Sequence, residues 1–109
     1  MSEQEQQPLN IEDADDQDIY RLRLFITGAS PNSTRAVNNL KMICETYLKE
    51  NYEMEIVDVH QQPLIAESEA IIALPLLIKK SPGPERRLIG DMSNTEKVLR
   101  GLGLSITDN

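Results

Sequence analysis

The pattern of apolar and polar positions predicts a strand followed by a helix in the first half of the chain. Apolar and polar residues alternate over 20–26, which is the period of a strand with one buried face. A turn at 27–29 follows, and Ser30 then stands where it can cap a helix that begins with Pro31. The apolar positions of this helix recur every three or four residues: Ala36, Val37, Leu40, Ile43, Cys44, Tyr47 and Leu48. They predict one buried stripe of about four turns that ends near residues 50–51.

Short apolar runs separated by prolines and glycines predict smaller elements in the second half. These are a strand at 53–59, a helix at 63–72, a strand at 76–78, a turn at 81–84 and a strand at 86–89. The helix is expected to bury Leu64, Ile65, Ile71 and Ile72. Glu67 and Glu69 lie two residues apart on it and therefore face different ways, which is typical of a solvated helix surface.

A last helix is predicted from a capping box, in which Ser93 is followed three residues later by Glu96. The apolar residues that this helix is expected to bury are Val98, Leu99 and Leu102. Gly101 and Gly103 weaken the helix, and we expect them to end it.

The order of these elements is βαβαββα, which is the arrangement of thioredoxin-like α/β proteins. A strand, a helix and a strand at the front imply a right-handed parallel crossover. The two closing strands add an antiparallel hairpin, and the last helix covers it. We therefore expect a mixed four-stranded sheet. In this fold a proline precedes the third strand, commonly after a cis peptide bond, and Pro75 stands in the matching place.

The charge of the chain is concentrated at its beginning. The 109 residues carry 18 acidic and 11 basic side chains, a net charge of −7. Seven of the acids, and no Lys or Arg, lie in residues 1–19, so the rest of the chain is electrically balanced. We expect 1–19 to be a disordered acidic tail, 20–104 to form one domain and 105–109 to be a C-terminal tail. The balance argues against nucleic-acid binding, which needs a basic surplus.

The sequence lacks the parts of a membrane protein and of a thioredoxin-type oxidoreductase. Its apolar runs are far shorter than the roughly 20 residues that span a bilayer, and no signal peptide is visible. A redox enzyme of this fold needs a reactive cysteine at the start of the first helix, and residues 28–33 contain none. The only cysteine, Cys44, lies in the apolar stripe and is predicted to be a core residue. A lone cysteine forms no internal disulfide, and we expect a cytoplasmic protein.

His60 is the only histidine of the chain. A catalytic interpretation would pair it with Asp58, or with Ser30 or Ser33, but no second histidine or nucleophile elbow supports that pairing. A surface histidine is the simpler interpretation. One histidine and one cysteine are too few ligands for a metal site, and we expect no cofactor. An enzyme that uses Cys44 or His60 stays open as an alternative hypothesis.

Two stretches carry a resemblance to a known family. Residues 24–33, Leu-Phe-Ile-Thr-Gly-Ala-Ser-Pro-Asn-Ser, resemble the opening motif of the KaiB family of circadian clock proteins. Residues 88–99, Leu-Ile-Gly-Asp-Met-Ser-Asn-Thr-Glu-Lys-Val-Leu, resemble its C-terminal signature more strongly. Between them, residues 56–59, 62–63 and 73–75 also fit. The resemblance covers about residues 20–104.

This resemblance implies a regulator without enzymatic activity that binds the KaiC ATPase ring, a RecA-like autokinase. In cyanobacteria the bound KaiB then sequesters KaiA and competes with an output kinase. The family is metamorphic: a ground state of order βαββααβ, tetrameric or dimeric, exchanges with a thioredoxin-like monomer that binds the partner. The resemblance places the fold-switch segment at Gly90, Asp91, Gly101 and Gly103.

The resemblance also implies a partner surface on the first helix, the second strand and its flanking loop. We expect this surface to include Arg35, Asn38, Asp58 and Lys79. Glu55 and Ala70 stand where cyanobacterial members commonly have lysines, which puts a KaiA-type partner in doubt. A clock, an hourglass timer and a stress-response system would all fit. The alternative is a KaiB-derived adaptor that binds another signalling protein through its acidic tail.

Overall fold

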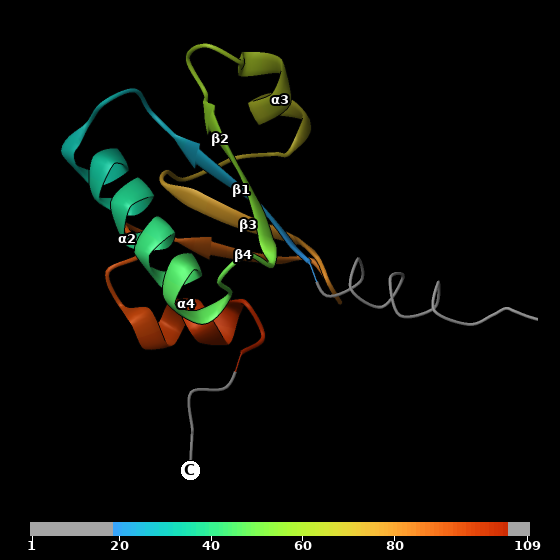
Figure 1. Cartoon of the computed structure of the whole chain (residues 1–109). Helices are drawn as coiled ribbons and strands as arrows, with labels where there is room; N and C mark the ends of the chain where they lie inside the picture. Colours follow the sequence, from blue (N-terminus) through green and yellow to red (C-terminus); the bar gives the residue numbers. More distant parts are fainter. Residues whose placement is uncertain (1–18, 105–109) are drawn as a thin grey trace, which may run out of the picture.

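A computed structural model describes residues 19–104, so the tails expected at 1–19 and 105–109 lie, apart from Ile19, outside the described residues. Figure 1 shows four strands and three helices in this part. They are β1 (Tyr20–Ile26), α2 (Pro31–Tyr47), β2 (Tyr52–Asp58), α3 (Pro63–Ser68), β3 (Leu76–Ser81), β4 (Arg86–Ile89) and α4 (Thr95–Gly101). The predicted order βαβαββα is confirmed. No helix of the described part is long and apolar enough to cross a membrane.

The strands form one mixed sheet in the order β2-β1-β3-β4. β1 runs parallel to β2, with Tyr20 opposite Tyr52 and Ile26 opposite Asp58. β3 is antiparallel to both β1 and β4. As Figure 1 shows, α2 and α4 lie on one side of the sheet and α3 lies on the other. The β1–α2–β2 unit is thus the parallel crossover that the sequence predicts.

Alternation along β1 divides the core between the two faces of the sheet. Leu24 points to the α2 and α4 side and is buried with Leu40 and Leu99, among others. Phe25, the next residue, points to the α3 side and is buried with Ile78. Each such side chain contributes about 1.5–3 kcal/mol when it leaves water. Both faces of the central strand therefore hold the domain together.

Side chains cap the N-terminal ends of α2 and α4. The Ser30 side chain accepts a hydrogen bond from the backbone N–H of Ser33, which confirms the predicted start of α2. The capping box expected for α4 is wrong by one residue. Asn94, not Ser93, is the N-cap, and its Oδ1 accepts the N–H of Lys97 at 3.0 Å. Asn and Ser are equally good N-cap residues, so the packing of the folded chain decided which of these two neighbouring residues caps α4.

The region after β2 differs most from its prediction. The helix ends at Ser68 rather than at residue 72, because Ala70 adopts a left-handed backbone (φ 56°) that a helix cannot continue through. Ile65 packs against the core as expected. Leu64 is 78% exposed and Ile72 is 91% exposed, so their predicted burial is wrong. β3 is longer than expected, since pairing with β1 carries the strand on to Ser81.

Candidate functional site

The exposed side of α2 is tied to the loop between β4 and α4. Arg35 Nε lies 3.4 Å from Asp91 Oδ2, and Asn39 Nδ2 donates to the backbone oxygen of Asp91 at 2.9 Å. A hydrogen bond from Ser93 lowers the pKa of the Asp91 carboxyl, and Arg35 lowers it further. Asn38 lies one position before Asn39 and is exposed. Arg35, Asn38, Asn39 and Asp91 together form what we call the α2 surface.

Asp58 lies at the same end of the sheet as the start of α2. It closes β2 opposite Ile26, the last residue of β1, from which the chain enters α2. Asp58 Oδ1 accepts the backbone N–H of His60 at 2.9 Å, and His60 Nε2 lies 3.2 Å from Thr27 Oγ1. Of the four expected partner-binding residues, Arg35 and Asp58 thus lie toward the same end of the sheet, whereas Asn38 lies near the middle of α2.

Lys79 is not part of that surface in this fold. It stands opposite Leu22, near the other end of the sheet, and is only 4% exposed. Its Nζ donates to the backbone oxygens of Pro82 and of Pro84, the latter at 2.9 Å. Burial lowers the pKa of this lysine, and the charge of Arg86 lowers it further. The ammonium group therefore organises the loop between β3 and β4 instead of facing a partner.

The glycines of the expected fold-switch segment lie on either side of the last turn-and-helix unit. Gly90 directly follows β4, and Gly101 and Gly103 lie at the C-terminal end of α4. Gly90 (φ 128°) begins the connection from β4 and donates its N–H to the oxygen of Pro75 at 3.0 Å. Gly101 is the last residue of the helix, and an added Cβ would lie 3.3 Å from the Leu88 side chain. Gly103 follows with φ 83°. The Leu74–Pro75 peptide bond is cis, as is Ser81–Pro82. Gly90 and Gly103 thus have backbone conformations that favour glycine, and Gly101 packs closely against Leu88.

The residues considered for catalysis are engaged in structural contacts. Cys44 is fully buried, and burial raises the pKa of its thiol to about 12. Ser33 is buried, and its Oγ accepts the Thr27 N–H at 3.0 Å and the Ser30 hydroxyl at 2.9 Å. His60 contacts Thr27 rather than either serine. The described residues contain no group of three or more His, Cys, Asp or Glu that could hold a metal ion.

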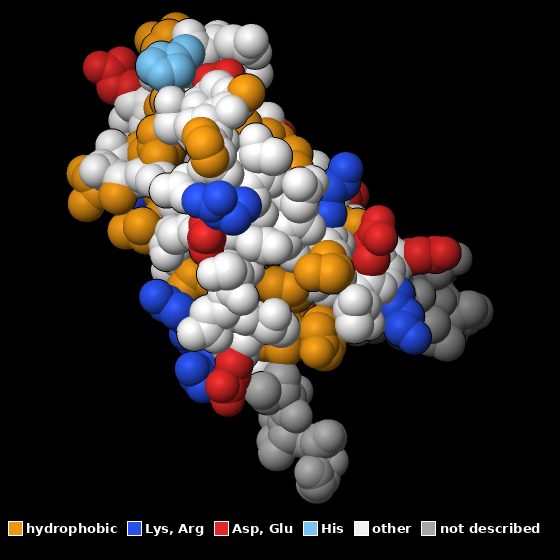
Figure 2. Space-filling view, turned by 90° about the vertical axis from the view of Figure 1, so that its left-hand side faces the viewer, with side chains coloured by type: hydrophobic (Ala, Val, Ile, Leu, Met, Phe, Trp, Pro, Cys, Tyr) orange, Lys and Arg blue, Asp and Glu red, His pale blue; other side chains and the backbone are white. Residues whose placement is uncertain are grey.

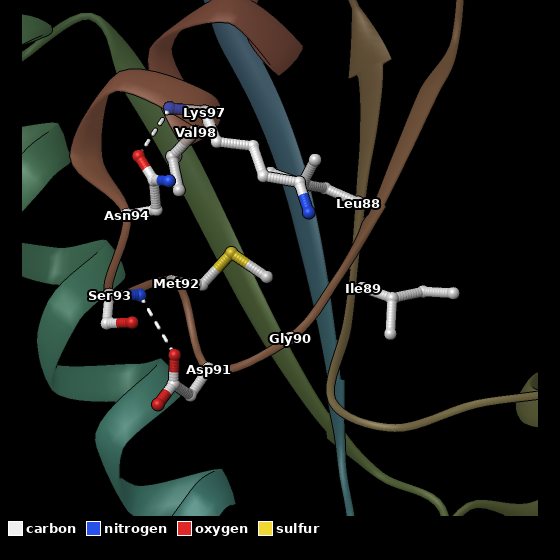
Figure 3. Close-up of a pocket in the computed structure, with 9 residues that line it drawn as sticks. All are labelled: Leu88, Ile89, Gly90, Asp91, Met92, Ser93, Asn94, Lys97 and Val98. Carbon is white, nitrogen blue, oxygen red and sulfur yellow. Dashed lines mark hydrogen bonds between the residues drawn. The ribbon is translucent and has the colours of Figure 1, made fainter.

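A shallow pocket of about 180 Å³ lies beside the α2 surface, between β4 and α4 (Figure 3). Two hydrogen bonds lie within it: Ser93 N donates to Asp91 Oδ1, and Lys97 N donates to Asn94 Oδ1, both at 3.0 Å. Figure 3 shows the Met92 side chain lying between these groups and Leu88.

A cluster of charged side chains on the α3 side of the sheet, Glu69 with Arg23, Lys80 and Arg87, was not predicted from the sequence, and we call it the Glu69 cluster. Glu69 lies 2.7 Å from Lys80 Nζ and 3.3 Å from both Arg23 Nη1 and Arg87 Nη2. Its side chain is 15% exposed, so the predicted solvated helix surface is wrong here. The hydrogen bond from Lys80 lowers the pKa of Glu69 despite burial. The sequence feature that could have predicted this cluster is a basic residue on each of three adjacent strands, namely Arg23, Lys80 and Arg87.

Comparisons with known sequences agree on one family. The KaiB domain model matches residues 23–104. Circadian clock protein KaiB3 of Synechocystis is 53% identical over 83 residues, which are 76% of this chain and 81% of that protein. Circadian clock oscillator protein KaiB of Prochlorococcus marinus subsp. pastoris is 49% identical over 85 residues, covering 78% and 79% of the two chains. The match to the domain model includes the whole of α2, the sheet from Arg23 onward, and α4.

Solved structures agree with the fold. The N-terminal domain of SasA from Synechococcus elongatus superposes with a TM-score of 0.65 at 21% identity, covering 84% of this chain and 90% of that one. Mitochondrial thioredoxin 3 from Saccharomyces cerevisiae gives 0.64 at 17% identity and covers 87% of each chain. At such identities the likeness shows the thioredoxin-like fold and nothing of its chemistry.

Proposed function

Because this chain belongs to the KaiB family, we propose that it is a non-catalytic regulator that binds a KaiC-like ATPase ring in the thioredoxin-like state described above. The observation that carries the proposal is the match of the KaiB domain to nearly the whole described unit. The start of α2 supports it, because the hydroxyls of Ser30 and Ser33 are used in capping there and no thiol is present. The system served is a clock, an hourglass timer or a stress response.

We place the contact with the ring on the α2 surface and on Asp58. Arg35 is exposed even while it pairs with Asp91, so it can exchange that partner for an acidic group of the ring. Figure 2 shows the side of the molecule that lies at the left of Figure 1, with basic and acidic side chains interspersed among apolar and uncharged ones. A mixed surface of this kind favours a specific protein contact over binding to a polyanion.

A KaiA-type partner is not part of the proposal. Glu55 lies on β2, the strand at the edge of the sheet, and pairs with Arg23 at 3.0 Å. Its negative charge stands where cyanobacterial members commonly carry a lysine, and the Arg23 charge next to it is already compensated. A partner that needs a basic β2 would meet repulsion here.

The test is to mix the purified chain with the KaiC-type ATPase of the same organism, ATP and a phosphomimetic variant. After long incubation, which allows for a slow change of fold, the mixture is separated by size-exclusion chromatography with light scattering. Co-elution with the hexameric ring is the expected result. Arg35→Glu should weaken it at least tenfold, whereas Lys49→Glu, just beyond the C-cap of α2, should not. Complete separation of the wild-type chain would instead favour an adaptor for another signalling protein.

A further inference from the structure

The free side of β4 carries an apolar groove that no described residue covers. β4 is the last strand of the sheet, so one of its sides has no neighbouring strand. The groove lies across this edge, between the loop after α3 and the start of α4, and has a volume of about 360 Å³. Ile72 and Ile89 line it and are 91% and 51% exposed. Figure 3 shows the Ile89 side chain directed away from Met92 and the pocket beside it. Arg87 and Lys97 give the groove a basic border.

The same edge presents unpaired backbone groups at defined positions. Gly90 donates its N–H to the oxygen of Pro75, and the pairing of β3 with β4 sets these two residues opposite each other. In an antiparallel pair the inward-bonding residues alternate. Leu88 therefore bonds toward β3, while the N–H and C=O groups of Arg87 and Ile89 point to the free side. The edge can accept one more strand, with hydrogen bonds at residues 87 and 89.

We propose that residues 9–14 of this same chain, Leu-Asn-Ile-Glu-Asp-Ala, pair with β4 as an additional antiparallel strand and place Ile11 in the groove. With Ile11 opposite Ile89, Asp13 stands opposite Arg87 on the same face, because side chains two apart share a face of a strand. Apolar therefore meets apolar, and the acid meets a guanidinium that also contacts Glu69 and Glu85. The spacing of the segment matches the spacing of the edge at both positions.

Charge and length both permit this occupant. Residues 1–18 hold seven acidic side chains and no Lys or Arg, whereas the edge strand opens with Arg86 and Arg87. Three strand spacings separate the added strand from β1, so Ala14 opposite Arg86 would lie about 16 Å from Tyr20. The five residues between them give six Cα–Cα steps, which can span about 20 Å when extended. After Ala14 the chain passes Arg86 and enters β1, so β1 runs antiparallel to the added strand.

The pairing would give the acidic segment a role that does not depend on KaiC. A sheet edge with exposed apolar residues invites pairing with other chains, and a covering strand prevents it. The proposal is thus independent of the proposed function, and its test needs no ATPase.

Amide hydrogen exchange on the full-length chain, measured residue by residue by NMR, tests the proposal. The amides of Arg87 and Ile89 should exchange at least about tenfold more slowly in the wild-type chain than in Ile11→Asp, because the variant cannot seat its side chain in an apolar groove. The matched control is Gln6→Asp, which adds the same charge outside the paired segment and should leave both amides protected. Amides of β2, on the opposite edge, should not respond to either change.

Three results would overturn the proposal. The first is equally fast exchange at Arg87 and Ile89 in the wild-type chain and in Ile11→Asp. The second is protection that persists in Ile11→Asp, which would mean that something other than this segment covers the edge. The third is protection that rises with protein concentration together with a dimer in sedimentation, which would assign the segment to a second copy of the chain.

Discussion

The carboxylate of Glu69 lies 2.7 Å from the ammonium group of Lys80, across the gap between the end of α3 and the sheet. Arg23 and Arg87 reach the same carboxylate from the strands on either side of β3. One acidic side chain therefore joins β1, β3 and β4 to the segment that follows α3. Any other packing of the second half of the chain must separate these four residues or rebuild their contacts.

Glu69→Gln should destabilise the thioredoxin-like state by about 1–2 kcal/mol, because one amide oxygen cannot serve three cations as a carboxylate does. Urea unfolding followed by circular dichroism measures the change. Glu67→Gln is the control: Glu67 is exposed on the same helix, and its substitution should change the midpoint little. Equal midpoints for both variants would mean that the cluster contributes nothing.

The same pair of variants predicts a pH effect. The pKa of Glu69 is lowered in the folded chain, so the folded state binds its proton less readily than the unfolded state does. Its stabilising contribution is present at neutral pH and is lost as the pH falls from about 4.5 through the lowered pKa. The wild-type chain and Glu69→Gln should therefore converge in stability as acid is added. A constant difference down to pH 2 would contradict this.

Asn94→Ala should cost about 1 kcal/mol of stability, because the N–H of Lys97 loses its capping acceptor. Ser93→Ala, one residue earlier, should cost less than about 0.5 kcal/mol, since its side chain does not cap α4. Thermal unfolding of the two variants side by side measures the difference. The opposite order would restore the capping box that the sequence suggested.

Lys79 predicts a second pH effect at the alkaline end. Its pKa is lowered by burial, so between the lowered value and the usual value of 10.5 the unfolded chain holds the proton that the folded chain has lost. Lys79 should therefore add stability as the pH rises through that window, whereas the raised pKa of Cys44 acts in the opposite direction. The stability of the wild-type chain relative to Lys79→Met should accordingly increase with pH, and urea midpoints of both chains at pH 7 and pH 10 test it. Relative to Lys97→Met, changed at an exposed position, the stability of the wild-type chain should stay constant.

Cys44 should resist alkylation in the folded chain. Its thiol is fully buried and its pKa is raised to about 12, so at pH 8 only about one molecule in ten thousand carries the reactive thiolate. Iodoacetamide labelling followed by mass spectrometry should show reaction only after unfolding in urea. Rapid modification of the native chain would reopen the hypothesis of a thiol enzyme.

Much of the fold followed from local signals. Alternation over β1 and the three-and-four spacing of α2 are strong periodic patterns, and Ser30 with Pro31 gave the start of α2 correctly. The apolar run at residues 71–72 was too short to show whether its period was that of a helix or a strand. Alanine usually favours a helix, so the sequence did not indicate that Ala70 would adopt a left-handed conformation and end α3 before it. Of the expected partner surface, Arg35 and Asp58 lie toward the same end of the sheet and Asn38 lies near the middle of α2, and their contact with KaiC stays a prediction.

The sequence alone determined the order of elements, the family, the buried stripe of α2 and the absence of a thiol at its start, because each is written in residues close together along the chain. Only the tertiary structure decided that the Glu69 side chain is largely buried and that the Lys79 side chain bonds to the loop between β3 and β4. Both outcomes depend on which strands become neighbours, and long-range pairing sets the surroundings of a charged side chain that local pattern leaves on the surface.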